Sequence, residues 1–381
     1  MKHFLVICLL IQLGLSKSSA QTPKKFEVLI EIPTTINPFF IQLYYDDGKK
    51  LTRVTPNFKE NRMSLSAPYT GRYATIRIAY QDGNPAYKFR EFDKFWISEQ
   101  PAIIRFKPTK EVYPLSEREL VNALEVRDNG EKEFEAYITK EKKAFQSYYA
   151  TNESKLEKND SLAWRILDQK TDTLQLKTLE FIKQNGNLYF SFWYFRLGIA
   201  GNAITPVDTL IKIYNTVFPE NFKNSEDGEQ IERKLKARAI KKNDMAPTFK
   251  MVNITGKTIA LDNYRGKYVL LTFWATWCRP CVEELPLLVS LRKEFPSAKL
   301  EIISVNQDSD STTFVRGINK YHLNWTHVFG NKTVGNDYGI SGIPEVFLID
   351  PTGKILYIRR EEKDYKPSLS ILSKVLKENL E

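Results

Sequence analysis

The sequence predicts a multidomain chain with an all-β, sandwich-like N-terminal domain, a helical middle segment and an α/β C-terminal domain. At 381 residues the chain is longer than one ordinary domain. Apolar residues alternate with polar ones in the first third, recur at helical spacing in the middle third, and form short runs between helical stretches in the last third. We expect a leader at residues 1–20, a β-rich domain at 21–112, a helical region at 113–242 and the α/β domain at 243–381.

The chain begins with the pattern of a secretory signal. Lys2 precedes an apolar run at residues 4–15, and small residues follow in the pattern Ser18-x-Ala20. Because the run is too short to span a membrane comfortably, we expect cleavage after Ala20 and export of the mature protein. Cys8 offers the alternative of a lipid anchor, which the bulky residue before it disfavours. No later segment is apolar and long enough to suggest an integral membrane segment after cleavage.

The charge pattern disfavours a nucleic-acid partner. The formal net charge is +10, from 56 Lys and Arg against 46 Asp and Glu. The two signs alternate closely, as in Glu131-Lys132-Glu133, which is typical of solvated helix faces.

Alternating apolar residues in the first domain predict strands at residues 26–32, 40–45 and 73–80. Turns rich in Gly, Asn and Pro separate these runs, which is typical of a small sandwich or barrel. This region contains no catalytic constellation. Its strand edges could bind a partner, but a plain folding unit is the favoured interpretation.

The middle segment carries apolar residues at helical spacing at residues 115–126, 134–149, 162–182 and 207–217. Ser161 is the expected N-cap of the third helix, and Thr205, followed by Pro206, is the expected N-cap of the fourth. The aromatic run at residues 189–195 could form a binding platform, but a buried helical core is favoured.

Strands and helices alternate in the last third of the chain. A hairpin is expected at residues 249–261. Strands are then expected at residues 269–274, 300–305, 326–329, 346–349 and 355–358, and helices at 279–295, 312–321 and 369–380. This alternation predicts a sheet that is covered by helices on both faces.

Cys278 and Cys281 carry the chemistry that the sequence suggests. They follow the predicted strand at residues 269–274 and stand where a helix begins, so unpaired N–H groups and the helix dipole favour a thiolate over a thiol. A thiolate attacks disulfides, and a second thiol one turn further on completes the exchange. After loss of the signal these are the only cysteines, and His322 and His327 are the only histidines. This composition argues against a zinc site or a disulfide-stapled scaffold.

Four pieces of the last third identify a family resemblance. They are Ala246-Pro247, Phe273-Trp274-Ala275-Thr276-Trp277-Cys278-x-x-Cys281, Glu284-Leu285-Pro286 and Gly342-Ile343-Pro344. Together they resemble a TlpA/ResA-like thiol-disulfide oxidoreductase domain with the thioredoxin fold, within the AhpC/TSA–redoxin superfamily. The upstream region resembles, more weakly, the uncharacterised N-terminal half that precedes such modules in some Gram-negative bacteria. The resemblance therefore implies a periplasmic or cell-envelope location.

The resemblance implies a role for each of the matching polar residues. Cys278 is the expected attacking nucleophile and Cys281 the resolving thiol, and the two form the redox-active disulfide. Thr272 occupies the position at which thioredoxins commonly have a buried acid. TlpA/ResA-like proteins carry an acid three residues after the second cysteine, and Glu284 resembles it. The resemblance therefore favours Glu284, one helical turn after Cys281, as the proton acceptor over a merely solvated carboxylate.

The resemblance also suggests how a client binds. Pro344 resembles the cis-proline that faces the cysteines, where backbone groups of Ile343 can pair with an extended client. Trp277 is expected to contribute to the same surface, and both Trp277 and Trp274 are expected to pack around the site.

Two residues between the cysteines are expected to tune the reaction. Arg279 places a positive charge beside Cys278, which should lower the pKa of that thiol. The alternative is a solvent-facing arginine whose charge is screened. Pro280 is expected to influence the reduction potential together with Arg279.

The predicted function is that of an exported protein-disulfide reductase that works through a mixed disulfide and needs no cofactor or metal. Its expected partners are an upstream electron donor and protein thiol clients, such as apo-cytochromes or other envelope proteins. One alternative is a thiol peroxidase, but its pattern requires Pro seven and Thr three positions before the cysteine, where this chain has Leu271 and Ala275. Another is a binding or scaffold protein, which the intact cysteine pair argues against.

Overall fold

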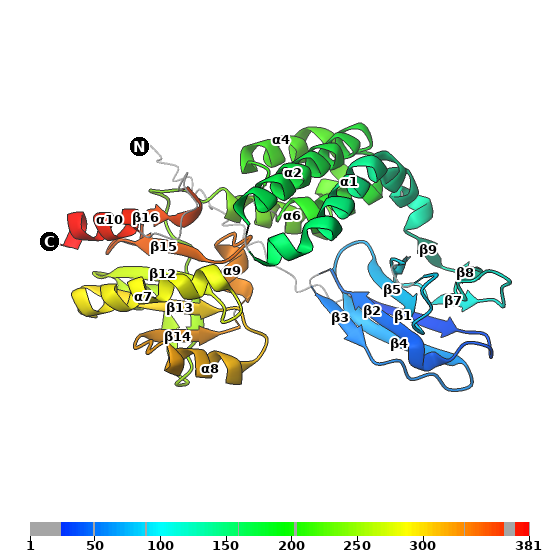
Figure 1. Ribbon diagram of the computed structural model, residues 1–381, viewed down its shortest axis with the longest axis horizontal. Coiled ribbons are helices and arrows are strands. Elements are labelled where there is room, and N and C mark those ends of the chain that lie inside the picture. The colour runs from blue at the N-terminus through cyan, green and yellow to red at the C-terminus, as the bar shows by residue number, and fades with distance from the viewer. Residues whose placement is uncertain are drawn as a thin grey trace, which may run out of the picture. The chain divides into compact units, whose positions relative to one another are not determined.

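The computed structural model of the protein forms two compact units, residues 1–125 and 126–381 (Figure 1). The structure describes residues 24–361 and 370–380, apart from 49, 88–89, 159, 202–203 and 331. The predicted secretory signal and its alternative lipid site at Cys8 lie outside the described residues. The four-part division predicted from the sequence stays a prediction.

The first unit is a β-sandwich, as expected. One sheet has the strand order β4 (Arg62–Tyr69), β1 (Lys24–Glu31), β7 (Ala102–Phe106), β8 (Arg118–Val121). The other has the order β3 (Leu51–Val54), β2 (Ile41–Asp46), β5 (Ala74–Tyr80), β6 (Asp93–Ile97), β9 (Ala123–Glu125). Alternate residues of β1, such as Phe26 and Val28, share one buried core with Ile76 and Ile78 of β5, so both sheets contribute to it.

The helix predicted at residues 115–126 is wrong, because this segment forms β8 and β9. Ile103 of β7 pairs with Val121, which extends the first sheet. Asn122 then adopts a positive φ of 52°, and the chain crosses to pair with β6 in the second sheet. Pairing with existing strands prevails over the helical spacing of the apolar residues.

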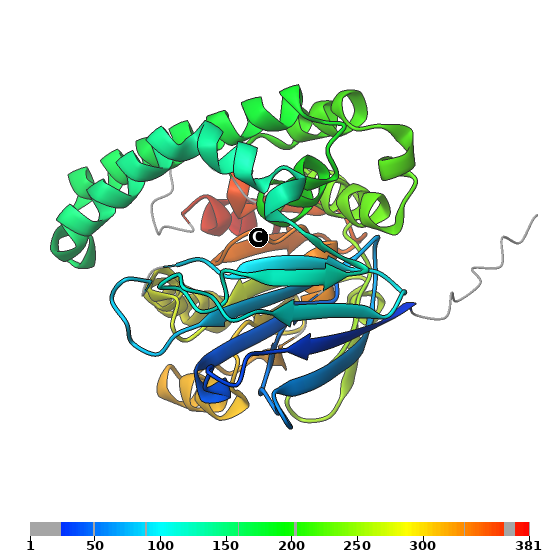
Figure 2. The ribbon, with the colours of Figure 1, turned by 90° about the vertical axis from the view of Figure 1, so that its right-hand side faces the viewer.

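The second unit begins with helices: α1 (Glu131–Glu157), α2 (Ser161–Gln184), α3 (Tyr189–Tyr194), a π-helical turn (Phe195–Ile199), α4 (Val207–Val217), α5 (Glu220–Lys223) and α6 (Glu226–Arg238). The three remaining helix predictions are therefore confirmed. Helices α1 and α2 pack along each other as a long hairpin, which Figure 2 shows from the side.

The predicted caps of two helices are wrong. Asp160 is the N-cap of α2, where its carboxylate accepts hydrogen bonds from the backbone N–H groups of Leu162 and Ala163 at 3.0 and 2.9 Å. Ser161 is the first helical residue. Thr205 is buried against Gln175, and Pro206 directly precedes α4.

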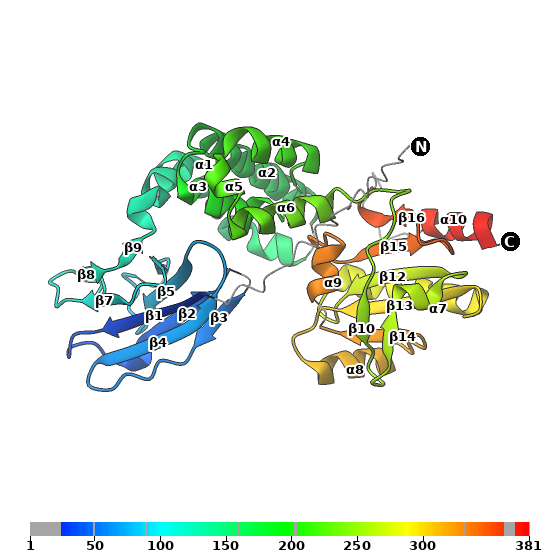
Figure 3. The ribbon, with the colours of Figure 1, turned by 180° about the vertical axis from the view of Figure 1, so that it is seen from behind.

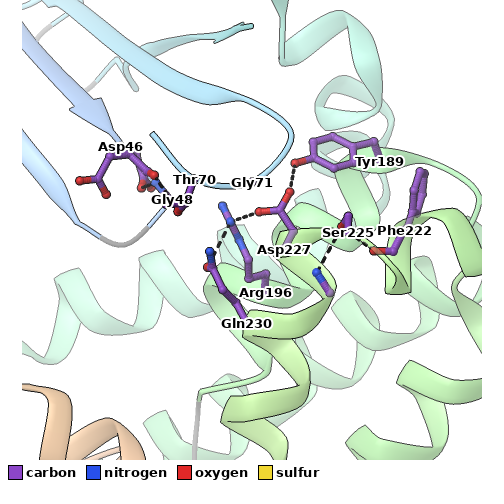
Figure 4. Close-up of polar contacts among 12 residues, drawn as sticks. Asp46, Gly48, Thr70, Gly71, Tyr189, Arg196, Phe222, Ser225, Asp227 and Gln230 are labelled. Atoms are coloured by element: carbon purple, nitrogen blue, oxygen red, sulfur yellow. Dashed lines mark hydrogen bonds and ion pairs between the residues drawn. The ribbon is translucent and has the colours of Figure 1, made fainter. Parts of the chain in front are cut away.

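The aromatic run at residues 189–195 forms a buried core, as expected. Phe190, Phe192 and Phe195 are at most 1% exposed. A polar network fixes this run to α6: Arg196 forms a buried ion pair with Asp227, and the Tyr189 hydroxyl donates to the same carboxylate at 2.8 Å (Figure 4). The network joins the aromatic run to α6, the last helix before the C-terminal strands.

The C-terminal part of this unit has the α/β thioredoxin fold. After the hairpin β10 (Lys250–Val252) and β11 (Thr258–Ala260), five strands form a sheet with the order β14 (Thr326–Phe329), β13 (Leu300–Asn306), β12 (Tyr268–Trp274), β15 (Glu345–Ile349), β16 (Ile355–Ile358) (Figures 1 and 3). The central strand β12 runs parallel to β13 and antiparallel to β15. The helices are α7 (Arg279–Glu294), α8 (Ser311–Lys320), α9 (Lys332–Asp337) and α10 (Ser370–Leu380).

The sheet is buried on both faces, as the alternating pattern predicted. Leu270 and Leu348 belong to a cluster with residues of α7 and α10. Leu271 and Phe347, their neighbours on β12 and β15, belong to a second cluster that includes Tyr338. Because successive residues of one strand point to opposite faces, the two clusters lie on opposite sides of the sheet.

Backbone hydrogen bonds attach the linker after α6 to this sheet. The N–H of Asn243 donates to Ile355 of β16 at 2.8 Å, and the N–H of Ile355 donates to Asp244 at 2.9 Å. Gly339 lies so close to the end of α6 that a Cβ atom there would come within 2.5 Å of the Ala237 carbonyl. Among the described residues no helix is long and apolar enough to cross a membrane.

Candidate active site at the cysteine pair

Cys278 occupies the N-cap of α7, at the end of the central strand. Its sulfur accepts a hydrogen bond from the backbone N–H of Cys281 at 3.3 Å, and the two cysteines form a disulfide. The free N–H groups and dipole of a helix N-terminus stabilise negative charge, so this position favours the thiolate of Cys278 after reduction.

Both cysteines lie in an apolar environment. Cys278 is 5% exposed and Cys281 2%, and both belong to the cluster beneath α7. Trp274 is also buried, as expected, but Trp277 is 69% exposed, so the expectation that it packs around the site is wrong. Trp277 lies in the loop after the end of β12, where the sheet no longer covers it. Its ring is available to a partner beside Cys278.

The loop before β15 faces the disulfide. The Ile343–Pro344 peptide bond is cis, as expected. The Cys278 sulfur lies 3.7 Å from the carbonyl oxygen of Ile343, and Pro344 is buried. The sequence therefore predicted correctly that these distant segments meet.

A buried carboxylate that sequence reasoning missed holds the loop before the cysteines. The Asp308 side chain accepts hydrogen bonds from the backbone N–H and the hydroxyl of Thr276, at 3.1 and 3.0 Å. Asn306 at the end of β13 donates to the same carboxylate at 2.9 Å. Gly317 of α8 packs against Thr276, where a Cβ atom would come within 2.7 Å of its methyl group. Only the pairing of β12 with β13 brings these groups together, and no local sequence signal marks it.

Glu284 lies on the buried face of α7. Its carboxylate forms an ion pair with Arg359, in the turn Arg359–Glu361 after β16, and both side chains are at most 5% exposed. The sequence suggested Glu284 but gave no sign of its partner. Thr272 is buried on β12, so a neutral side chain occupies the position of the acid common in thioredoxins.

The residues between the cysteines face solvent. Arg279 is exposed and pairs with Glu283 at 2.8 Å, one turn along α7. Pro280 is exposed in the first turn of the helix. This placement agrees with the alternative interpretation of Arg279 as a solvent-facing residue, and the tuning role of both residues stays a prediction.

Glu345 is a second buried carboxylate that the sequence reasoning did not single out. It follows Pro344 directly and pairs in register with Phe273 on β12. Burial raises the pKa of Glu345, an effect that nearby Arg360 partly offsets. Within the described part of the chain, no group of three or more His, Cys, Asp or Glu side chains could hold a metal ion.

Comparison with known proteins places this site in a family. The AhpC/TSA family matches residues 243–358. Thiol-disulfide oxidoreductase ResA of Bacillus subtilis (strain 168) is 34% identical over 121 residues, which are 32% of this chain and 68% of that protein. The chain belongs to the AhpC/TSA family. A second ResA, from Bacillus thuringiensis (strain Al Hakam), is 35% identical over 113 residues, which are 29% of this chain and 65% of that protein.

The match to these family members is partial. The chain spans about two thirds, 65%, of the length of the first ResA relatives. Among solved structures, the thioredoxin domain of a thiol-disulfide oxidoreductase from Bacteroides vulgatus is 26% identical, covers 36% of this chain and 99% of that chain, and gives a TM-score of 0.32. The family match covers residues 243–358, so it lies within the C-terminal part of the chain and does not extend over the β-sandwich or the helices before it.

Proposed function

We propose that this protein is an exported thiol–disulfide oxidoreductase that reduces protein disulfides. The observation that carries the proposal is the disulfide between Cys278 and Cys281 at the N-terminus of α7, opposite the Ile343 carbonyl. Membership of the AhpC/TSA family and similarity to ResA proteins support a redox role.

The reaction has two thiol–disulfide exchanges. The Cys278 thiolate attacks one sulfur of the client disulfide, so a Cys278–client bond forms and the other client sulfur leaves as a thiolate that takes up a proton. The Cys281 thiol then loses its proton and attacks Cys278. The Cys278–Cys281 disulfide forms, the remaining client sulfur leaves as a thiolate, and two electrons have passed to the client. An upstream dithiol donor returns the pair to the reduced state.

Glu284 is proposed to accept the proton of Cys281. The two residues are three positions apart on α7, so their side chains are neighbours on one helix face, and both are buried. A buried thiol is hard to ionise without a nearby base. Glu283, exposed on the same helix, provides the matched control for a Glu284→Gln substitution.

Trp277, Ile343 and Pro344 are proposed to bind the client. The exposed Trp277 ring and the backbone of Ile343 lie on the two segments that meet at Cys278. An extended client segment beside Ile343 would bring its disulfide to that sulfur. Arg279 and Pro280 are proposed to tune the pair, with only a small contribution from the exposed charge of Arg279. The electrons reside on sulfur throughout, so the reaction requires neither a cofactor nor a metal.

The predicted signal at residues 1–20 supports export, and the resemblance of the upstream region to the N-terminal half of such proteins in Gram-negative bacteria favours a periplasmic or cell-envelope location. An oxidising compartment contains disulfides to reduce. Apo-cytochromes and other envelope proteins with cysteine pairs fit the proposed client class.

A direct test mixes the reduced protein with a peptide that contains one internal disulfide and measures the peptide thiols. We expect two thiols per protein for the native chain and none for Cys278→Ser. Peroxide consumption is measured in parallel with the same protein. Faster turnover of peroxide than of peptide would favour the thiol peroxidase, and loss of neither substrate would favour the scaffold.

A further inference from the structure

The ion pair between Glu284 and Arg359 is the most deeply buried charge pair near the cysteines. The two side chains are 4% and 5% exposed. They come from separate elements, since Glu284 lies on α7 and Arg359 follows β16. A buried charge is costly unless an opposite charge lies beside it, and here each of the two side chains supplies that charge for the other.

Two adjacent arginines pair with two different carboxylates: Arg359 with Glu284 and Arg360 with Glu345. The Arg360 guanidinium lies over the Phe347 ring, and its nitrogen is 3.6 Å from the Glu345 carboxylate. Phe347 belongs to the cluster on the face opposite α7. Arg359 instead contacts α7, the helix that carries both cysteines.

Few other charges face this pair among the described residues. Glu283 on the same helix is exposed and pairs with Arg279. Glu345 on β15 is buried, and burial raises the pKa of its carboxyl more strongly than the charges of Arg360 and Arg359 lower it. The charges of α10 that the structure describes lie at the surface, in the pairs Lys374–Glu378 and Lys377–Glu294. The guanidinium of Arg359 contacts the Glu284 carboxylate directly.

This geometry assigns a task to Arg359. A proton acceptor must be ionised before the Cys281 thiol gives up its proton, whereas burial alone favours the neutral acid, which cannot accept it. We propose that Arg359 is a positioning residue that holds the Glu284 carboxylate ionised and in place one helical turn from Cys281. The inference rests on the proposed role of Glu284. In this proposal Arg359 acts through Glu284, and so on the second exchange, in which Cys281 attacks Cys278 and the client sulfur leaves.

The experiment separates the two exchanges with 5,5′-dithiobis(2-nitrobenzoate). The reduced full-length protein releases one coloured thiolate when Cys278 attacks the reagent, and a second when Cys281 resolves the mixed disulfide. Both rates are followed by stopped flow across pH. The variants are Arg359→Met, Arg359→Lys and Glu284→Gln, and the control is Arg292→Met, which removes a half-buried arginine from the other end of α7.

For Arg359→Met we expect the first release to stay within about twofold of the native rate. The second release should slow at neutral pH by at least about tenfold, because an unpaired buried carboxyl takes up a proton and general base catalysis is lost. The pH profile of the second release should move to higher pH in Arg359→Met. Arg359→Lys should restore much of the native rate of the second release, and Arg292→Met should leave its pH profile unchanged. If the Glu284–Arg359 pair were merely structural, Arg359→Met would change the rates of both releases or of neither, and the pH profile of the second release would not shift.

An unmoved profile in folded Arg359→Met, while Glu284→Gln slows the second release, would overturn the inference and leave the proposed function intact. Absence of a second release from the native protein would instead contradict the proposed function. If Arg359→Met does not fold, ¹³C NMR of the native protein measures the protonation state of the Glu284 carboxyl, and its signal is assigned by comparison with Glu284→Gln. A Glu284 carboxyl that is protonated at pH 7 would refute the role of Arg359, and an ionised one is the expected result.

Discussion

The sulfur of Cys278 lies 3.7 Å from the carbonyl oxygen of Ile343, although the two residues are 65 positions apart in the sequence. Their proximity follows from the sheet, because β12 ends at Trp274, four positions before Cys278, β15 begins directly after Pro344, and the two strands are antiparallel neighbours. The attacking sulfur and the backbone proposed to bind the client are therefore fixed to one rigid framework.

The two tryptophans beside the cysteines should differ sharply in their contribution to stability. Trp274→Ala should lower the free energy of unfolding by about 3–5 kcal/mol, because it leaves a cavity in the core. Trp277→Ala should change it by less than about 0.5 kcal/mol, because the ring is 69% exposed. Urea denaturation of both variants checks this. Equal losses would mean that Trp277 packs into the core.

The charge of Arg279 should have only a small effect on Cys278. Its guanidinium is exposed and paired with Glu283, so screening limits its influence. We expect Arg279→Ala to slow alkylation of reduced Cys278 by less than about threefold at low salt, and the difference to vanish near about 1 M salt. A larger, salt-independent decrease would show that Arg279 acts on the thiolate at close range.

His327 should make the protein less stable in acid. Burial lowers its pKa from 6.5 to about 4, and its ring bonds the Leu323 carbonyl at 3.1 Å. Between these values the unfolded chain binds a proton that the folded chain does not. His327 therefore leaves the free energy of unfolding undiminished above pH 6.5. As pH falls from 6.5 towards 4, that free energy decreases progressively, by on the order of 3 kcal/mol in total.

The matched substitutions are His327→Gln and His322→Asn, which alter the buried and the exposed histidine. The free energy of unfolding is measured by urea titration at several pH values. His327→Gln should flatten the decline between pH 6.5 and 4, and His322→Asn should preserve it. An unchanged slope in His327→Gln would assign the acid sensitivity to other groups.

Gly339 should tolerate no side chain. Its φ is +64°, and an added Cβ would lie 2.5 Å from the Ala237 carbonyl at the end of α6. Gly256 has a φ of +81° with open space around it, so Gly256→Ala measures the backbone strain alone. We expect Gly256→Ala to cost about 1 kcal/mol of unfolding free energy and Gly339→Ala clearly more. Equal costs would show that the end of α6 moves away freely.

The sequence predicted the alternating C-terminal elements and the meeting of Cys278 with Pro344, because strand periodicity and a distinctive motif determine both. It missed Arg359 as the partner of Glu284, since a charged residue that follows an apolar strand resembles any surface residue. It also missed Asp308, whose carboxylate holds the loop before the cysteines through a hydrogen bond from Thr276, a contact that depends on the pairing of β12 with β13. The helix predicted at residues 115–126 failed for a related reason, because β7 offers strand pairing that local spacing does not reveal.

The central claim is that Cys278 forms a mixed disulfide that Cys281 resolves. The most direct measurement uses reduced Cys281→Ser with a peptide that contains one internal disulfide, followed by intact-mass analysis without reductant. The account predicts one covalent adduct on Cys278, which dithiothreitol removes and which Cys278→Ser does not form. Absence of the adduct from folded Cys281→Ser would contradict the account.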